Sequence, residues 1–208
     1  MPHHVLMARL PSVLDTHDLP LAELCAARLD GELVAIDDGW TPLDEPDLPA
    51  LRAAVTALRA PRSLVIERMS AAWVHGALAT PPPVAQFCVP ISARIAVIAD
   101  RRAVVREVRL GDDDVMRFGD VPCTTPVRTA FDLLRDTTLD EAAIIAAVAW
   151  LAALHPGLGP AVRDRFEAAT RLPHKATAMA RLRDAEQATW SAAIGRAAVR
   201  GEPLPPAG

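Results

Sequence analysis

The chain has 208 residues, enough for one large domain or two small ones with a buried core. Apolar residues make up 51%, but aromatic residues only 4% and tyrosine is absent, so the core has to consist mainly of Ala, Val, Leu and Ile. No apolar run reaches the roughly 18 residues that a membrane span needs, and the start lacks the pattern of a secretory signal. Cys25, Cys88 and Cys123 form no C-x-x-C pair, which indicates reduced thiols in the cytoplasm and no zinc cluster.

The net charge of −4 is unevenly distributed along the chain. Residues 1–60 carry four arginines against ten acidic residues, whereas residues 61–110 carry seven arginines against three. A DNA-binding surface therefore has to be local. The candidate contacts in the central strands are Arg94, Arg101, Arg102, Arg106 and Arg109. A second set lies in the tail: Arg163, Arg165, Arg181 and Arg183. The alternative is that these arginines form solvated faces that neutralise nearby acids.

The first 46 residues predict a small helical unit with a hairpin. A helix is expected over 19–31, started by Pro20 and ended by Gly31. Its apolar face is predicted to consist of Leu21, Leu24, Cys25 and Leu29. The stretch ELVAI then alternates like a strand, DDG is a turn signal and WTPL returns. A helix before a two-stranded ribbon is typical of a winged helix-turn-helix, here in degenerate form.

The middle of the chain predicts a sheet flanked by helices. A polar, Pro-containing break at 44–49 precedes a helix over 49–60, and a second helix over 69–78 is expected to be capped by Ser70 and stopped near Gly76. The expected strands are 63–67, 85–91, 94–99, 103–110 and a pair in 115–123 that turns at Gly119–Asp120. Strands grouped between helices favour an α+β fold over a doubly wound sheet.

The most patterned stretch, GDVPCTTPVRTAFDLLRD over 119–136, predicts a helix at 126–135. Thr125 is a suitable N-cap and Pro126 suits the first turn, where its missing N–H is tolerated. Val127, Phe131 and Leu134 share one face. Arg128 and Asp132 are four positions apart and are expected to pair. A cation in a first turn opposes the helix dipole, so Arg128 should also meet an acid or a carbonyl elsewhere. A structural role for Arg128, Thr129 and Asp132 is the leading interpretation, and binding is the alternative.

Further helices are expected over 140–154 and in an Ala-rich tail that breaks near Pro173 and ends around Arg200. His75 has no second ligand at metal spacing, so a satisfied core or surface histidine is favoured over a base. The GDDDV run at 111–115 is interpreted as a solvated turn. Neither a nucleotide-binding glycine motif nor a G-x-S-x-G occurs, which indicates a protein that is not an enzyme, with no catalytic residue, metal or cofactor.

The order of these segments resembles a family of actinobacterial regulators, the AbiEi-type antitoxins of type IV toxin–antitoxin systems. The first match, a Ser-Ala-Ala-x-x-x-Gly helix, falls on Ser70, Ala71 and Gly76. The second falls on Gly119, Pro122, Thr124, Pro126, Arg128, Thr129, Asp132 and Leu133, next to the cap Thr125. Together the matches span roughly residues 65–155.

This resemblance implies a DNA-binding winged-helix N-terminus and a second domain linked to toxin neutralisation. The chain departs from the family at the wing, which is Arg-rich in the family but acidic here. The six acids are Asp30, Glu32, Asp37, Asp38, Asp44 and Glu45. They would repel phosphates. The tail resembles the segment that leads into a Vsr-like endonuclease domain in longer relatives, but Ile194 stands where a carboxylate is expected. This match implies a version without the nuclease.

The sequence thus predicts an α+β protein with three parts. Residues 1–46 form a degenerate winged helix-turn-helix, 47–156 a mixed helix–sheet domain and 157–208 a helical extension. The expected function is a non-enzymatic, cytoplasmic, antitoxin-like regulator that binds duplex DNA and a cognate toxin or other protein. The alternative is a protein-interaction or scaffold module that has lost DNA binding.

Overall fold

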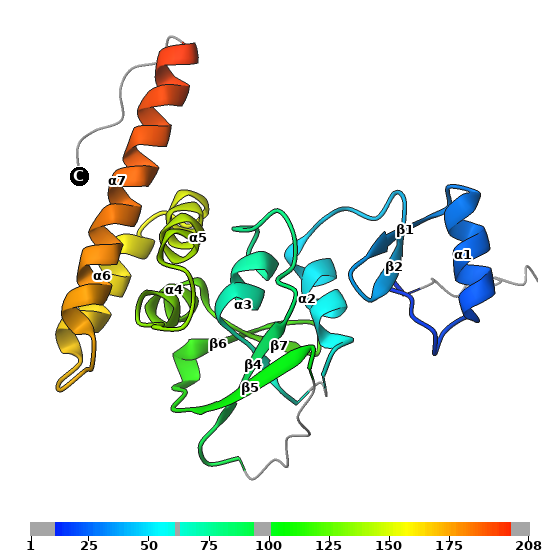
Figure 1. Ribbon diagram of the computed structural model, residues 1–208, viewed down its shortest axis with the longest axis horizontal. Helices are drawn as coiled ribbons and strands as arrows, with labels where there is room; N and C mark the ends of the chain where they lie inside the picture. The colour runs from blue at the N-terminus through cyan, green and yellow to red at the C-terminus, as the bar shows by residue number, and fades with distance from the viewer. Residues whose placement is uncertain (1–10, 61–62, 94–100, 201–208) are drawn as a thin grey trace, which may run out of the picture.

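The computed structural model describes residues 11–60, 63–93 and 101–200, with side chains up to residue 189. A small N-terminal unit lies at one end, a mixed β-sheet in the middle and a group of helices at the other end (Figure 1). This arrangement confirms the predicted α+β class. The candidate strand at 94–99 lies outside the described residues.

The N-terminal unit consists of helix α1 (Leu21–Leu29) and an antiparallel hairpin of β1 (Leu33–Ile36) and β2 (Gly39–Pro42). Its small core contains Leu14, Leu24 and Leu33, with Trp40 packed against it. The predicted apolar face of the helix is wrong except for Leu24. Leu21 and Leu29 are 55% and 87% exposed, and Cys25 is also exposed. A single small hairpin covers only a narrow strip of α1, so the remaining apolar side chains stay in solvent.

A five-stranded mixed sheet forms the centre of the body. Its strands are β3 (Val65–Ile66), β4 (Ala85–Pro90), β5 (Ala103–Val108), β6 (Val115–Phe118) and β7 (Val121–Thr124). They are ordered β5-β4-β3-β7-β6, and β4 pairs with β5 and β3 with β7 in parallel. The predicted turn at Gly119–Asp120 is confirmed by the antiparallel pairing of β6 with β7. Gly119 has φ 59°, a left-handed conformation that glycine adopts readily.

Helix α2 (Pro49–Ala57) and helix α3 (Arg68–Val74) pack on this sheet. Ala71, Trp73 and Val74 belong to the sheet core, whereas Met69 and Ala72 belong to a second core formed by helices. The prediction that Ser70 caps α3 is wrong, because Ser70 lies inside the helix and its Oγ accepts a hydrogen bond from Gln86 N at 2.9 Å. Gly76 ends the segment as predicted, at φ 86°.

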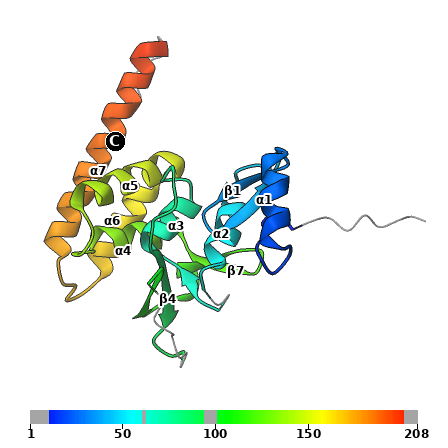
Figure 2. The ribbon, with the colours of Figure 1, turned by 45° about the vertical axis from the view of Figure 1, so that its right-hand side comes forward.

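The helical core joins four C-terminal helices. They are α4 (Pro126–Leu134), α5 (Glu141–Leu154), α6 (Leu158–Ala168) and α7 (Lys175–Arg200). Phe131, Val148, Phe166 and Leu182 represent one buried side chain from each. The boundary expected at residue 156, between the mixed helix–sheet domain and the helical extension, stays a prediction. Helices α6 and α7, which follow it, share this core with α4 and α5. Helix α7 runs beside the others and continues beyond the body (Figures 1 and 2).

Within the described residues, no single helix is long and apolar enough to cross a bilayer. Only α5 and α6 taken together reach that length and composition, and they are bent by 119° relative to each other.

Candidate functional site

The start of α4 is formed as the sequence predicts. Thr125 is the N-cap, and its Oγ1 accepts a hydrogen bond from Arg128 N at 3.3 Å, while Pro126 occupies the first turn. The backbone N–H of Thr125 donates to Asp114 O at 2.9 Å. The helix start is therefore joined to the turn that precedes β6.

Arg128 connects α4 to this turn through its guanidinium group. Nε donates to Asp132 Oδ2 at 2.8 Å, which confirms the predicted pair. Nη1 donates to Asp114 Oδ2 at 2.6 Å and to Arg109 O at 2.8 Å. The expectation that Arg128 meets a further acid or carbonyl is confirmed for both kinds of partner. At 6% exposure, Arg128 is a buried cation.

The prediction that the GDDDV run is a solvated turn is wrong for Asp114. Asp112 and Asp113 are exposed, but Asp114 is only 4% exposed. Asp114 accepts two hydrogen bonds from Arg165 of α6, at 2.6 and 3.1 Å, and one from Gly111 N at 2.9 Å. Burial raises the pKa of Asp114, but the hydrogen bonds from Arg165 and Gly111 and the charge of Arg128 outweigh it, so the pKa lies below its usual value.

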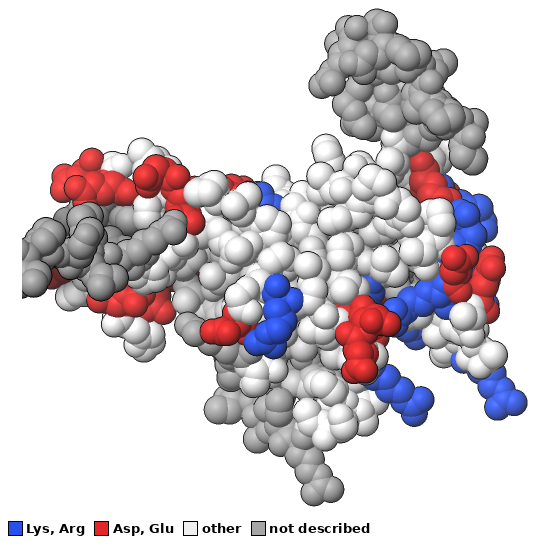
Figure 3. All heavy atoms as spheres, turned by 180° about the vertical axis from the view of Figure 1, so that it is seen from behind, with Lys and Arg blue, Asp and Glu red and all other residues white. Residues whose placement is uncertain are grey.

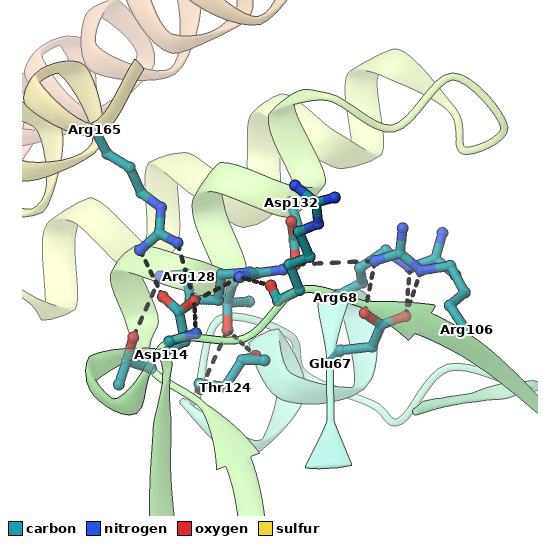
Figure 4. A network of polar contacts seen from close by, with 12 residues as sticks. Glu67, Arg68, Arg106, Asp114, Thr124, Arg128, Asp132 and Arg165 are labelled. Carbon is teal, nitrogen blue, oxygen red and sulfur yellow. Dashed lines mark hydrogen bonds and ion pairs between the residues drawn. The ribbon is translucent and has the colours of Figure 1, made fainter. Parts of the chain in front are cut away.

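A second group of charges surrounds Glu67, which is fully buried at the start of α3. Arg106 of β5 donates from Nε and Nη2 to the two Glu67 oxygens, both at 2.6 Å. Arg68 Nε lies 3.3 Å from Glu67 Oε1, and Arg68 also pairs with Asp136. Because Arg106 Nη2 lies 3.9 Å from Asp132 Oδ2, the two groups of charges meet at α4 (Figure 4).

The end of α4 is held by Asp136 and Arg181. Asp136 Oδ1 accepts from Thr138 N at 2.7 Å and from Leu139 N at 3.0 Å. Although burial raises the pKa of Asp136, hydrogen bonds from the hydroxyl and the backbone N–H of Thr138, together with Arg68, lower it to about 2. Arg181 of α7 donates to Leu134 O at 3.0 Å and to Asp136 O at 2.6 Å, which satisfies carbonyls at the C-terminus of α4.

The remaining motif residues close the space between α4 and β7. Thr129 Oγ1 and Thr124 Oγ1 are 2.7 Å apart, and His75 Nε2 lies 2.7 Å from Thr124 O. A neutral ring with its proton on Nε2 donates to this carbonyl. Burial lowers the pKa of His75 to about 4, so the ring is uncharged near neutral pH. The interpretation of His75 as a satisfied core histidine is confirmed.

The candidate DNA-contacting arginines fall into different environments. Arg94 lies outside the described residues. Arg106 is bound to Glu67, and Arg102 forms an ion pair with Asp38 of the hairpin. Arg101 and Arg109, on either side of β5, are exposed. In the tail, Arg163 pairs with Glu186 at 2.7 Å, Arg165 and Arg181 have the partners given above, and Arg183 is exposed.

The acidic hairpin does not present all its carboxylates to solvent. Asp37 and Asp38, at its turn, both form ion pairs with Arg59, which follows α2. These two carboxylates therefore face the body of the protein instead of an incoming phosphate. Acidic side chains nevertheless gather over the N-terminal unit on the face drawn in Figure 3, whereas both basic and acidic side chains lie over the body.

The chemistry of the network is that of structural ion pairing. Each of its four carboxylates has a guanidinium partner. The lowered pKa values of Asp114 and Asp136 make these two carboxylates weak bases. Burial raises the pKa of the Cys88 and Cys123 thiols, so they are protonated and poor nucleophiles. Among the residues the structure describes, no three His, Cys, Asp or Glu side chains are placed to hold a metal ion.

The sequence predicts no ion pair for Glu67, Arg68, Asp114 or Asp136, and it indicates Arg106 and Arg165 only as candidate DNA contacts. These residues come from segments far apart along the chain, and no spacing rule connects them.

A comparison with models of known protein families finds no match to the chain, and no curated protein matches it significantly.

Proposed function

We propose that the protein is a non-enzymatic cytoplasmic regulator of the AbiEi antitoxin type, with a degenerate winged helix-turn-helix at its N-terminus. The observation that carries the proposal is that hydrogen bonds and ion pairs connect the motif residues of α4 to the neighbouring sheet. Arg128 links α4 to Asp114, while Thr124 and Thr129 link the same helix to β7. The residues that carry the family resemblance thus stand at the spacing that these contacts of α4 require.

The N-terminal unit supports the winged-helix part of the proposal in outline. A helix, α1, precedes the antiparallel hairpin β1–β2, in the order of a recognition helix and its wing. The hairpin turn is neutralised by Arg59 and Arg102, so the acids at its tip repel DNA less than the sequence suggests. We assign phosphate contacts to Arg101 and Arg109, because both are exposed.

Titration of fluorescent duplexes tests this function. The purified protein is titrated into the duplex from its own upstream region and into a random duplex of equal length. Tighter binding to the upstream duplex is expected for an autoregulatory protein. Equal affinity for both duplexes would contradict autoregulation, and no binding to either would leave the scaffold as the better account.

The alternative, a protein-interaction module, is favoured by one surface. The outward face of α5 is apolar, and Trp150 and Leu154 on it are 56% and 47% exposed. Co-expression with the neighbouring open reading frame, followed by purification of the complex, distinguishes the two accounts. A complex that Trp150→Ser abolishes, in a protein that binds neither duplex, would establish the scaffold.

Catalysis is not part of the proposal. The protein is expected to show no nuclease or hydrolase activity above background with or without divalent cations. DNA cleavage that required a metal and disappeared when one carboxylate was substituted would refute the non-enzymatic assignment.

A further inference from the structure

Arg135, at the C-terminal end of α4, differs from the other arginines around the buried network. The network contains the carboxylates of Glu67, Asp114, Asp132 and Asp136, and four guanidinium groups pair with them: Arg68, Arg106, Arg128 and Arg165. Arg135 lies next to these groups, and its guanidinium group forms no hydrogen bond or ion pair with any residue that the structure describes. The cluster therefore carries one positive charge more than its carboxylates neutralise.

The position of Arg135 makes this surplus charge unfavourable. Its Nε is buried without an acceptor, and its guanidinium group lies 5.1 Å from the centroid of the Phe131 ring. Burial lowers the pKa of Arg135; Asp132 raises it, but the charges of Arg128 and Arg106 lower it again, so the pKa lies below its usual value. A group that has lost water at Nε and is repelled by two neighbours gains more from an anion than an exposed arginine does.

The neighbouring Arg106 guanidinium group retains an unused donor. Arg106 binds Glu67 through Nε and Nη2, and its side chain is 38% exposed, which leaves Nη1 without a hydrogen bond among the described residues. Arg165 lies 4.8 Å from the centroid of the same Phe131 ring and is 33% exposed. Arg135 is thus placed near the partly open guanidinium group of Arg106, and the Phe131 ring that it contacts also contacts Arg165.

We propose that Arg135, assisted by Arg106, binds a phosphate group on this side of α4. Guanidinium groups donate two N–H bonds in a fork that matches phosphate oxygens. A phosphate carries between one and two negative charges and accepts from more than one guanidinium, so it neutralises the surplus charge and binds the terminal nitrogens of both side chains. The group is either free inorganic phosphate or the terminal phosphate of a nucleotide.

Thermal unfolding in a phosphate-free buffer, with chloride added to constant ionic strength, measures this binding. Inorganic phosphate and a 5′-mononucleotide are titrated separately, and each is expected to raise the Tm of the wild-type protein. Phosphate alone raising Tm identifies the free anion, and the nucleotide acting at lower concentration identifies the nucleotide. Arg135→Gln is expected to weaken the effect at least about tenfold, whereas the control Arg183→Gln, an exposed arginine of α7, leaves it unchanged.

The same variant separates binding from a structural role. Without phosphate, Arg135→Gln should unfold at a temperature equal to or above that of the wild type, because it removes an unneutralised charge. An Arg135→Gln protein that was less stable than the wild type without phosphate would overturn the proposal. The same holds if phosphate raised the Tm of wild type, Arg135→Gln and Arg183→Gln equally, or of none of them.

Discussion

Arg128 Nη1 lies 2.6 Å from Asp114 Oδ2, although Asp114 belongs to a run of three aspartates on the far side of a β-hairpin from α4. This contact attaches the first turn of α4 to the turn that precedes β6. Since Asp114 also binds Arg165 of α6, one carboxylate connects the sheet to two helices.

Replacing Asp114 should destabilise the protein more than replacing its neighbours. Asp114→Asn leaves Arg165 without a carboxylate and removes one of the two carboxylates that bind Arg128, and we expect a loss of about 3 kcal/mol in the free energy of unfolding. Asp113→Asn, one position earlier and exposed, should change it by no more than about 0.5 kcal/mol. Urea denaturation measures both. Equal losses for the two variants would mean that the Asp114 ion pairs contribute nothing specific.

Arg128 and Asp132 should be energetically coupled. Arg128→Ala removes one partner from each of two buried carboxylates and should cost about 3–5 kcal/mol. Asp132→Ala should cost less, about 1–3 kcal/mol, because Arg128 keeps Asp114. A double-mutant cycle should give a coupling energy of at least about 1 kcal/mol. If the two losses simply added, or if both variants kept full stability while losing a partner, the pair would not have the structural role assigned to it.

Local signals explain why the sequence predicts the start of α4 but not the network around it. Thr125 and Pro126 act within one turn of the helix, and Arg128 and Asp132 are four residues apart, so their roles follow from spacing. In the sequence, Asp114 cannot be distinguished from Asp112 and Asp113. It differs from them only because α4 and α6 pack next to it in the folded chain. Such a partner is not encoded in any short window of sequence.

The errors in the N-terminal half have the same origin. The periodic apolar residues of α1 suggested a broad buried face, but the unit that packs on it is too small to cover more than Leu24. Ser70 has the residue type of a cap, yet the strand β4 lies close enough for its hydroxyl to bind Gln86 N instead. In both places, tertiary neighbours decide what the side chain does.

Protonation of His75 should weaken the protein at mildly acidic pH. The folded-state pKa of about 4 lies below the unfolded value of about 6.5, so the unfolded chain binds a proton first. Stability should therefore be fully present above about pH 6.5 and fall as the pH approaches 4, by up to about 3 kcal/mol.

Chemical denaturation at several pH values measures this loss. His75→Gln, whose amide can still donate to Thr124 O, should show a smaller decrease over the same range. His17→Gln, at an exposed position, should follow the wild type. A wild-type stability that stayed constant between pH 7 and pH 4 would contradict a neutral buried His75.

The hairpin turn should be held to the body by charge. Asp37→Asn with Asp38→Asn removes the ion pairs with Arg59 and Arg102. The Arg102 pair is exposed and contributes about 1 kcal/mol or less, whereas the Arg59 side chain is only 6% exposed. We expect faster amide hydrogen exchange in β1 and β2 and little change in α5. Asp44→Asn, an exposed acid of the same unit, should leave exchange as in the wild type. Unchanged exchange in the double variant would show that the apolar contacts alone hold the hairpin.

The salt dependence of binding to the upstream duplex tests most directly the claim that this protein is a DNA-binding regulator. Each phosphate contact contributes about 0.9 to the slope of log affinity against log salt. Arg101→Glu with Arg109→Glu should therefore flatten the slope by about two units, whereas Arg171→Glu with Arg183→Glu, the same charge change at exposed tail positions, should flatten it much less. Arg106 is unsuitable for this reversal, because a glutamate there would face buried Glu67. A slope that Arg101→Glu with Arg109→Glu left unchanged, or no binding by the wild-type protein, would contradict the account.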